Sequence, residues 1–397
     1  MTQELIYLLL IFALLVIPRA LQRFHLPAPL SCLIFGIAAM LWLGDGAHDP
    51  VVHLLATLGI SSLFLFAGLE VDLQALRQSL KPLLAHLAIR ALTLSIVGWL
   101  AMRWGGMGWQ AAGLLALALL TPSTGFIMES LARLPLGEEE RFWITNKAIA
   151  GELLALAALF FVLQADDPVH LATSSLILLG MTIGLPLVFI GLGRWVVPHA
   201  PGSEFSLLVM VGMVAAWITY SLGVYYLVGA FIAGLVARLL YERMPLLASE
   251  QNLHALRLFS SFFVPFYFFN AGTKVPAEAL VWQALLIGLG LTVVVLPLRI
   301  GIVWLQRRAL FGERWDVSWR VALALSPTLI FTLVLAGILL ERFNLPPVWY
   351  GGLLLYAGLT TLLPSLLLRT ALDPDPGQGG PVPGGHGIEP GAVDLPR

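Results

Sequence analysis

The chain has 397 residues, of which 59% are hydrophobic and only 11% are charged, against about 25% in an ordinary soluble domain. Its net charge of −1 gives no reason to expect a nucleic acid as a partner. The single cysteine, Cys32, excludes a disulfide within the chain. The apolar residues form continuous runs and do not alternate with polar ones, which disfavours a transmembrane β-barrel. The composition therefore indicates an all-α polytopic membrane protein in contact with lipid.

Apolar runs bounded by Pro, Gly or charge predict thirteen transmembrane helices within residues 1–372. In chain order the runs cover residues 4–18, 28–43, 51–69, 82–101, 109–132, 142–164, 170–193, 203–220, 224–241, 254–272, 278–306, 317–340 and 347–369. The first run is interpreted as a span and not as a signal peptide, because Glu4 precedes it and Pro18-Arg19 follows it. Residues 373–397 are dominated by Pro and Gly and are predicted to be a disordered tail.

The loop cations predict the orientation of these spans. On one side of the membrane lie Arg19, Arg23, Arg77, Lys81, Arg133, Arg141, Arg194, Arg238, Arg243, Arg257, Arg307, Arg308, Arg314, Arg320 and Arg369. On the other side lie only Arg103, Lys274 and Arg342. Because cytoplasmic loops are enriched in Lys and Arg, we expect the N-terminus outside and the C-terminus inside.

The fifth and twelfth spans resemble each other. The fifth reads ALALLTPSTGFIM and the twelfth ALALSPTLIFTLV, so Pro122 and Pro327 each interrupt a span beside Ser and Thr. A proline removes a helical hydrogen bond and clashes with the preceding turn, so both helices are predicted to break. Such kinks are common in single membrane helices, but interrupted spans at matching positions of two halves indicate a transporter with an inverted repeat.

One acidic residue lies near the centre of the bilayer. Glu152 is ten residues into the sixth predicted span, about 15 Å along the helix. An ion at this depth costs about 2.5–3.5 kcal/mol or more, so such residues normally pair or line water and have a function. Glu152 is therefore the principal candidate for binding an ion or a proton.

Three cations lie well inside predicted spans. Lys147 lies near the inner end of the sixth span, where its long side chain can reach water, and it is also a candidate counter-charge. Arg299 is too far from its span end to reach water easily, so pairing with Glu152 or another carboxylate is the favoured interpretation. Arg90 is interpreted as a structural link to a carbonyl or to Glu129.

Five stretches follow one another in a distinctive order. They are LFLFAGLEVDLQALR at 63–77, LTPSTGFIMESL at 120–131, AIAGELLALA at 148–157, LVGAFIAGLVAR at 227–238 and FFVPFYFFNAGTKV at 262–275. Together they resemble monovalent cation:proton antiporters, in the branch that contains bacterial sodium/proton exchangers and potassium efflux systems. The resemblance implies a thirteen-helix inverted repeat in which two crossed, unwound helices lie beside an ion-binding carboxylate. It also implies a homodimer in the inner membrane of a bacterial cell.

The sequence departs from these antiporters at three places. Many members carry Asp-Asp or Asn-Asp where this chain has Gly151-Glu152. Many carry Pro-Arg-Gly-Glu on the twelfth helix, where this chain has Pro327-Thr328-Leu329-Ile330 and lacks the acid. Potassium efflux relatives often append a nucleotide-binding domain, which the short tail cannot form. One central carboxylate therefore remains, and it favours electroneutral exchange of one Na⁺ or K⁺ for one proton.

Hydroxyls at the two helix breaks complete the predicted site. Thr121, Ser123, Ser326 and Thr328, with carbonyls freed at the breaks, are candidate ligands for a hard cation beside Glu152. The alternatives are a proton-coupled carrier of organic anions with the same fold, since Arg299 can attract a carboxylate, and a sensor that does not transport. An intramembrane enzyme is disfavoured because no H-E-x-x-H or G-x-S-x-G motif is present. No cofactor or metal other than the transported cation is expected.

Overall fold

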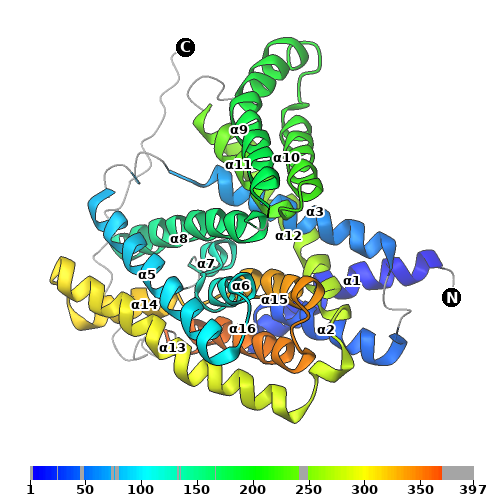
Figure 1. Ribbon diagram of the computed structural model, residues 1–397. Coiled ribbons are helices and arrows are strands. Elements are labelled where there is room, and N and C mark those ends of the chain that lie inside the picture. Colours follow the sequence, from blue (N-terminus) through cyan, green and yellow to red (C-terminus); the bar gives the residue numbers. More distant parts are fainter. Residues whose placement is uncertain are drawn as a thin grey trace, which may run out of the picture.

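The computed structural model describes residues 3–24, 26–44, 49–72, 76, 80–131, 134, 136–165, 167–240 and 249–368, and all regular structure in these ranges is helical (Figure 1). The first part of the chain forms α1 (Gln3–Leu21), α2 (Ala28–Leu43), α3 (Pro50–Leu69), α5 (Leu80–Gly105), α6 (Trp109–Leu120), α7 (Thr124–Leu131), α8 (Glu138–Gln164) and α9 (Pro168–Gly191). The second part forms α10 (Glu204–Ser221), α11 (Tyr226–Leu239), α12 (Glu250–Thr273), α13 (Trp282–Phe311), α14 (Trp315–Ala324), α15 (Leu329–Phe343) and α16 (Pro347–Leu367).

Each predicted apolar run corresponds to one helix or to two helices separated by a short break. Within the described ranges, nine helical segments are long and apolar enough to cross a membrane, or ten if the bent pair α14 and α15 forms one span. The all-helical membrane fold is therefore confirmed, whereas the number thirteen remains a prediction. Residues 373–397, predicted as a tail, lie outside the described residues.

The helices form two groups, each drawn from both halves of the chain. α1, α2, α3, α9, α10, α11 and α12 pack mainly with one another and are called here the scaffold group. α5, α6, α7, α8, α13, α14, α15 and α16 form the crossing group. In Figure 1, α9, α10 and α11 stand at the top, and most of the crossing group lies together below them. This mixed origin is what an inverted repeat produces.

Glycines allow α3 and α11 to approach closely in the scaffold group. A Cβ built at Gly234 would lie 2.1 Å from the Leu65 carbonyl oxygen, and one at Gly68 would lie 2.3 Å from the Phe231 carbonyl oxygen. Both contacts involve backbone atoms that cannot move aside. Small residues at such positions let membrane helices gain van der Waals contact. The sequence stretches FAGLE and LVGAFIAG therefore have a packing role at this crossing.

Both predicted breaks are present in the crossing group. α6 ends at Leu120 and α7 begins at Thr124, with Pro122 between them. α14 ends at Ala324 and α15 begins at Leu329, with Pro327 between them and a bend of 43°. The missing proline N–H and the clash of its ring with the preceding turn explain why an apolar run stops being helical there.

Candidate functional site

The two breaks lie directly against each other. The Ser123 N–H donates to the Pro327 carbonyl at 2.8 Å, and the Ile330 N–H donates to Ser123 Oγ at 2.8 Å. Backbone groups that left the helical pattern at one break thus find partners at the other, as buried polar groups require. The breaks form one crossing point, as the family resemblance implied.

Glu152 lies on α8 and is almost completely buried, with 2% of its surface exposed. Its Oε2 atom has no hydrogen-bond partner among the described residues. Thr124, the first residue of α7, lies close enough to interact with this carboxyl, but its Oγ1 makes no hydrogen bond of good geometry. A buried acceptor without a donor costs free energy unless a proton or a cation occupies it. The structure therefore holds a carboxylate that needs a positively charged ligand.

Thr121, at the end of α6, carries a second hydroxyl at this break that is not engaged in a hydrogen bond. It is fully buried, and its Oγ1 has no hydrogen-bond partner among the described residues. Thr124 was not among the residues chosen from the sequence, although it follows the Thr-Pro-Ser pattern directly. Thr121 and Thr124 flank Pro122, so the break itself supplies oxygen atoms of the kind that bind a hard monovalent cation.

The other three hydroxyls chosen from the sequence hold helices together. Ser123 accepts from the Ile330 N–H, and the Ser326 hydroxyl donates to the Thr360 carbonyl at 3.2 Å. The Thr328 and Thr360 hydroxyls are 3.1 Å apart. All are buried at the crossing point. A hydroxyl oxygen can accept more than one hydrogen bond, but these three hydroxyls already form the hydrogen bonds that connect α7, α15 and α16.

The predicted pairing of Arg299 with Glu152 is wrong. Arg299, on α13 and 8% exposed, donates to the Ser326 carbonyl at 2.8 Å, the Leu325 carbonyl at 3.2 Å and the Tyr356 hydroxyl at 3.1 Å. Those carbonyls belong to the break after α14, where they have no helical partner. The positive guanidinium group also complements the negative C-terminal end of a helix. Arg299 is therefore the counter-charge of a helix end and not of the carboxylate.

Arg90 has the equivalent role at the other break, as the sequence predicted. It lies on α5 and donates from Nη2 to the Leu120 carbonyl, the last residue of α6. α5 and α13 occupy corresponding places in the two halves, each immediately before a broken helix. The inverted repeat thus includes two arginines, Arg90 and Arg299, that each hold the carbonyl end of a half-helix.

Lys147 does not extend to water as one interpretation proposed. Only 1% of it is exposed, and its ammonium group interacts with the charges of Arg307 and Glu313. Arg307 is itself fully buried and forms an ion pair with Glu313 through two hydrogen bonds. α5, α7 and α14 pack against α8, which is why the side chain meets protein there. The side chain of Glu129 lies outside the described residues.

Comparison with known proteins agrees with this geometry. The profile of the family described as "Sodium/hydrogen exchanger, transmembrane" matches residues 8–373. A probable Na⁺/H⁺ antiporter 3 from Methanocaldococcus jannaschii is 25% identical over 278 residues, which are 68% of this chain and 71% of that protein. Two structures of the sodium proton antiporter MjNhaP1 from the same organism, one of them at pH 8, are 15% identical. The structure at pH 8 has a TM-score of 0.65, and the match covers 93% of this chain and 97% of that one. The other structure has a TM-score of 0.66, and the match covers 94% of this chain and 96% of that one.

The family match spans nearly all of the described helices, and the solved structures share the fold. Members of this family are transporters and not enzymes, which fits a site made of a buried carboxylate and helix breaks. This chain belongs to the sodium/hydrogen exchanger family, whose members are integral membrane antiporters of cations and protons.

Proposed function

We propose that this protein exchanges Na⁺ for protons and that both ions compete for the carboxylate of Glu152. The observation that supports this most directly is the buried Oε2 atom without a hydrogen-bond partner, beside the unused hydroxyls of Thr121 and Thr124. A protonated carboxyl and a carboxylate with a bound cation both remove the cost of a bare buried charge. Because one carboxylate accepts only one of the two ions at a time, their binding is mutually exclusive.

The transport cycle we propose is alternating access. The crossing group would carry Glu152 past the scaffold group, so that the site faces each side of the membrane in turn. We further propose a homodimer in a bacterial inner membrane, with the N-terminus outside and the C-terminus inside, and an electroneutral cycle. Sodium is the first candidate because the curated relative is described as a probable Na⁺/H⁺ antiporter, and K⁺ is the second.

The test is Glu152→Gln, measured as recovery of a pH-sensitive dye in everted vesicles after addition of sodium, potassium or lithium. The glutamine keeps the shape of the side chain but neither titrates nor carries charge, so we expect cation-dependent proton movement to be lost while folded protein is retained. Glu138→Gln is the matched control, because Glu138 is an exposed carboxylate in the first turn of the same helix. Recovery at the wild-type rate in Glu152→Gln would refute the assignment.

A further inference from the structure

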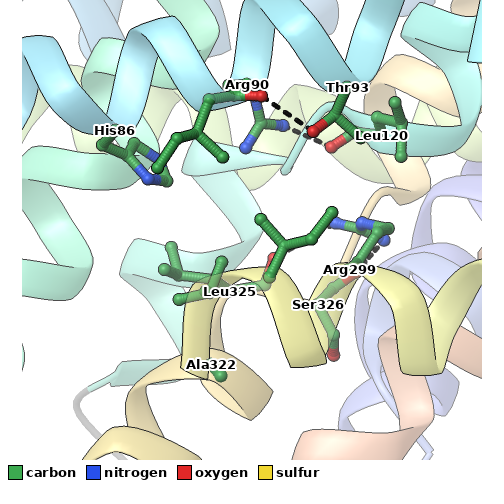
Figure 2. A pocket seen from close by; sticks show the side chains of 11 residues that line it. His86, Arg90, Thr93, Leu120, Arg299, Ala322, Leu325 and Ser326 are labelled. Atoms are coloured by element: carbon green, nitrogen blue, oxygen red, sulfur yellow. Dashed lines mark hydrogen bonds between the residues drawn. The ribbon is translucent and has the colours of Figure 1, made fainter. Parts of the chain in front are cut away.

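A cavity between α5 and α13 is lined by two arginines and a histidine. His86 and Arg90 reach it from α5 and Arg299 reaches it from α13, around the ends of α6 and α14 (Figure 2). The remaining lining residues are Ile89, Thr93, Leu120, Ile302, Val303, Ala322, Leu325 and Ser326. None of the lining residues is acidic.

The charges in this cavity are not balanced by a carboxylate. The guanidinium groups of Arg90 and Arg299 lie close enough to repel each other electrostatically. Each binds neutral acceptors, carbonyl oxygens in both cases and a tyrosine hydroxyl in the case of Arg299. Neutral acceptors satisfy the N–H groups but leave two like charges in a medium of low dielectric constant, where their repulsion is strong. An anion between the two groups would remove this repulsion.

Polar atoms at the cavity also lack partners. Arg90 Nε is enclosed and makes no hydrogen bond with the described residues. His86 is 4% exposed, and its Nε2 is likewise without a partner among them. The ring is fixed from its other side by Gln306, whose Oε1 lies 2.8 Å from His86 Nδ1. Both nitrogens belong to residues that line the cavity. Because buried polar groups are normally satisfied, they support the expectation of a ligand beside these residues.

The orientation of the Gln306 side chain decides which His86 nitrogen carries the proton. Gln306 Nε2 has no hydrogen-bond partner among the described residues either. Rotating the amide by half a turn makes it the donor to His86 Nδ1, so that the proton of the neutral ring lies on His86 Nε2. His86 then presents an N–H group to the cavity. This orientation is the one that an anion requires.

The cavity has room for a small ion. Its volume is about 40 Å³, whereas a single water needs about 10–15 Å³ measured in the same way. The space can therefore hold one halide ion with a water molecule. The walls beyond the polar atoms are aliphatic, which favours an ion of low charge density over a strongly hydrated dianion.

We propose that a small monovalent anion of the chloride class binds between Arg90 and Arg299, with His86 as a third contact, and stabilises the crossing of the two broken helices. The anion is a structural ligand and not the transported substrate. It connects the arginine that holds the end of α6 to the arginine that holds the end of α14. This role is separate from ion exchange at Glu152.

The proposal is tested by thermal unfolding of the purified full-length protein in detergent. Potassium chloride replaces potassium gluconate stepwise at constant ionic strength and constant sodium. Gluconate is much larger than chloride and fits the space between the two arginines less well, so chloride should raise the Tm saturably by about 2–4 °C. Equal Tm values in the two salts would overturn the proposal. Because the readout is stability, the outcome does not depend on whether the protein exchanges sodium for protons.

Two variants locate the effect. Arg90→Gln removes one of the cations, and Ala322→Leu fills the cavity while keeping both arginines; each should abolish the difference between chloride and gluconate. Arg103→Gln is the matched control, because Arg103 is an exposed arginine on the same helix, and it should retain the full difference. If Arg90→Gln does not fold, Ala322→Leu decides the question. An undiminished chloride effect in Ala322→Leu would place the anion elsewhere and refute the site.

Discussion

The guanidinium group of Arg90 lies against the backbone of Gly151, where a Cβ atom would be 3.3 Å from both Cζ and Nε of the arginine. Gly151 directly precedes Glu152 on α8, at the place where similar antiporters carry a polar residue. In this chain the space for that side chain is occupied by an arginine from α5. Arg90 therefore occupies the space that a side chain at position 151 would need.

Gly151→Asp should therefore create an ion pair with Arg90 and not a new cation ligand. The new carboxylate would compete with the Leu120 carbonyl for the guanidinium group. Loss of that charge-assisted hydrogen bond should cost about 1.5–3 kcal/mol, partly offset by the new pair. We expect Na⁺ selectivity and the response to voltage to stay as in the wild type, measured in proteoliposomes. Gly151→Ala adds the Cβ without charge and is the control for crowding.

A changed ion selectivity in Gly151→Asp would contradict this expectation. The double variant Arg90→Gln/Gly151→Asp provides the complementary measurement. Without the arginine, the added carboxylate has no neighbouring cation to neutralise it, and altered selectivity should appear only then.

Arg299→Ala should act on stability and leave the pH dependence of exchange nearly unchanged. Removing the guanidinium group leaves the Leu325 and Ser326 carbonyls without their donor, at about 1–3 kcal/mol for each buried acceptor. We expect a clear fall in Tm, with partial rescue by Arg299→Lys, which restores the charge but not the two-pronged contact. A shift of the activity profile to alkaline pH with an unchanged Tm would instead place Arg299 beside Glu152.

A pH-dependent contribution to stability is expected at the start of α3. Asp49 accepts hydrogen bonds from the Tyr7 hydroxyl at 2.7 Å and from the Val51 and Val52 N–H groups. Partial burial alone would raise the pKa of the Asp49 carboxyl, but these hydrogen bonds outweigh it and lower the pKa below 3.8. A lowered pKa in the folded state stabilises the protein above the unfolded value, and this contribution is lost as the pH falls through the folded value.

Asp49→Asn isolates that contribution, because asparagine still caps a helix but does not titrate. Since the site is partly exposed, the wild type should exceed Asp49→Asn in stability by less than about 1 kcal/mol near neutral pH. The difference should shrink as the pH is lowered from about 5 towards 2. A difference in Tm that stays constant over this range would show that the charge of Asp49 contributes nothing.

The positions of the helix breaks and of the buried carboxylate could be predicted because both depend on local sequence. Pro122 and Pro327 interrupt apolar runs wherever the helices pack, and Glu152 is central because of its distance from the span end. The family resemblance added the expectation that these features meet. The two breaks meet through the hydrogen bonds of Ser123 with the Pro327 carbonyl and with the Ile330 N–H group.

The partners of the arginines could not be predicted in the same way. Arg299 binds backbone carbonyls, which every residue has and which become available only after the neighbouring helix breaks. A sequence shows carboxylates but not unpaired carbonyls, so sequence reasoning favours pairing with Glu152 or another carboxylate. Thr124 could not be predicted for a similar reason. Only the crossing of the helices decides that the Ser123 hydroxyl accepts a hydrogen bond from the other break while the Thr124 hydroxyl makes none among the described residues.

The stoichiometry can be tested by applying a membrane potential to proteoliposomes. Among the described residues inside the spans, only Glu152 is a carboxylate without a fixed cation. One proton should therefore be exchanged for one cation, and no net charge should cross. If one net charge moved, 100 mV would contribute about 2.3 kcal/mol, equal to about a 50-fold change in the equilibrium ion ratio. We expect the exchange rate and the final sodium ratio to be the same at zero and at −100 mV.

A voltage dependence would instead require a second moving charge, and Lys147 is the residue on which to test it. It lies five residues from Glu152 on α8, is fully enclosed, and interacts with the Arg307–Glu313 ion pair. Under the electroneutral cycle this ammonium group keeps its proton throughout, so Lys147→Gln should leave the exchange insensitive to voltage, whatever its effect on rate. Wild-type exchange that responds to the potential, and a Lys147→Gln variant that does not, would show that Lys147 releases and rebinds a proton in each cycle. The single-carboxylate stoichiometry would then be wrong, because two protons would move for each cation.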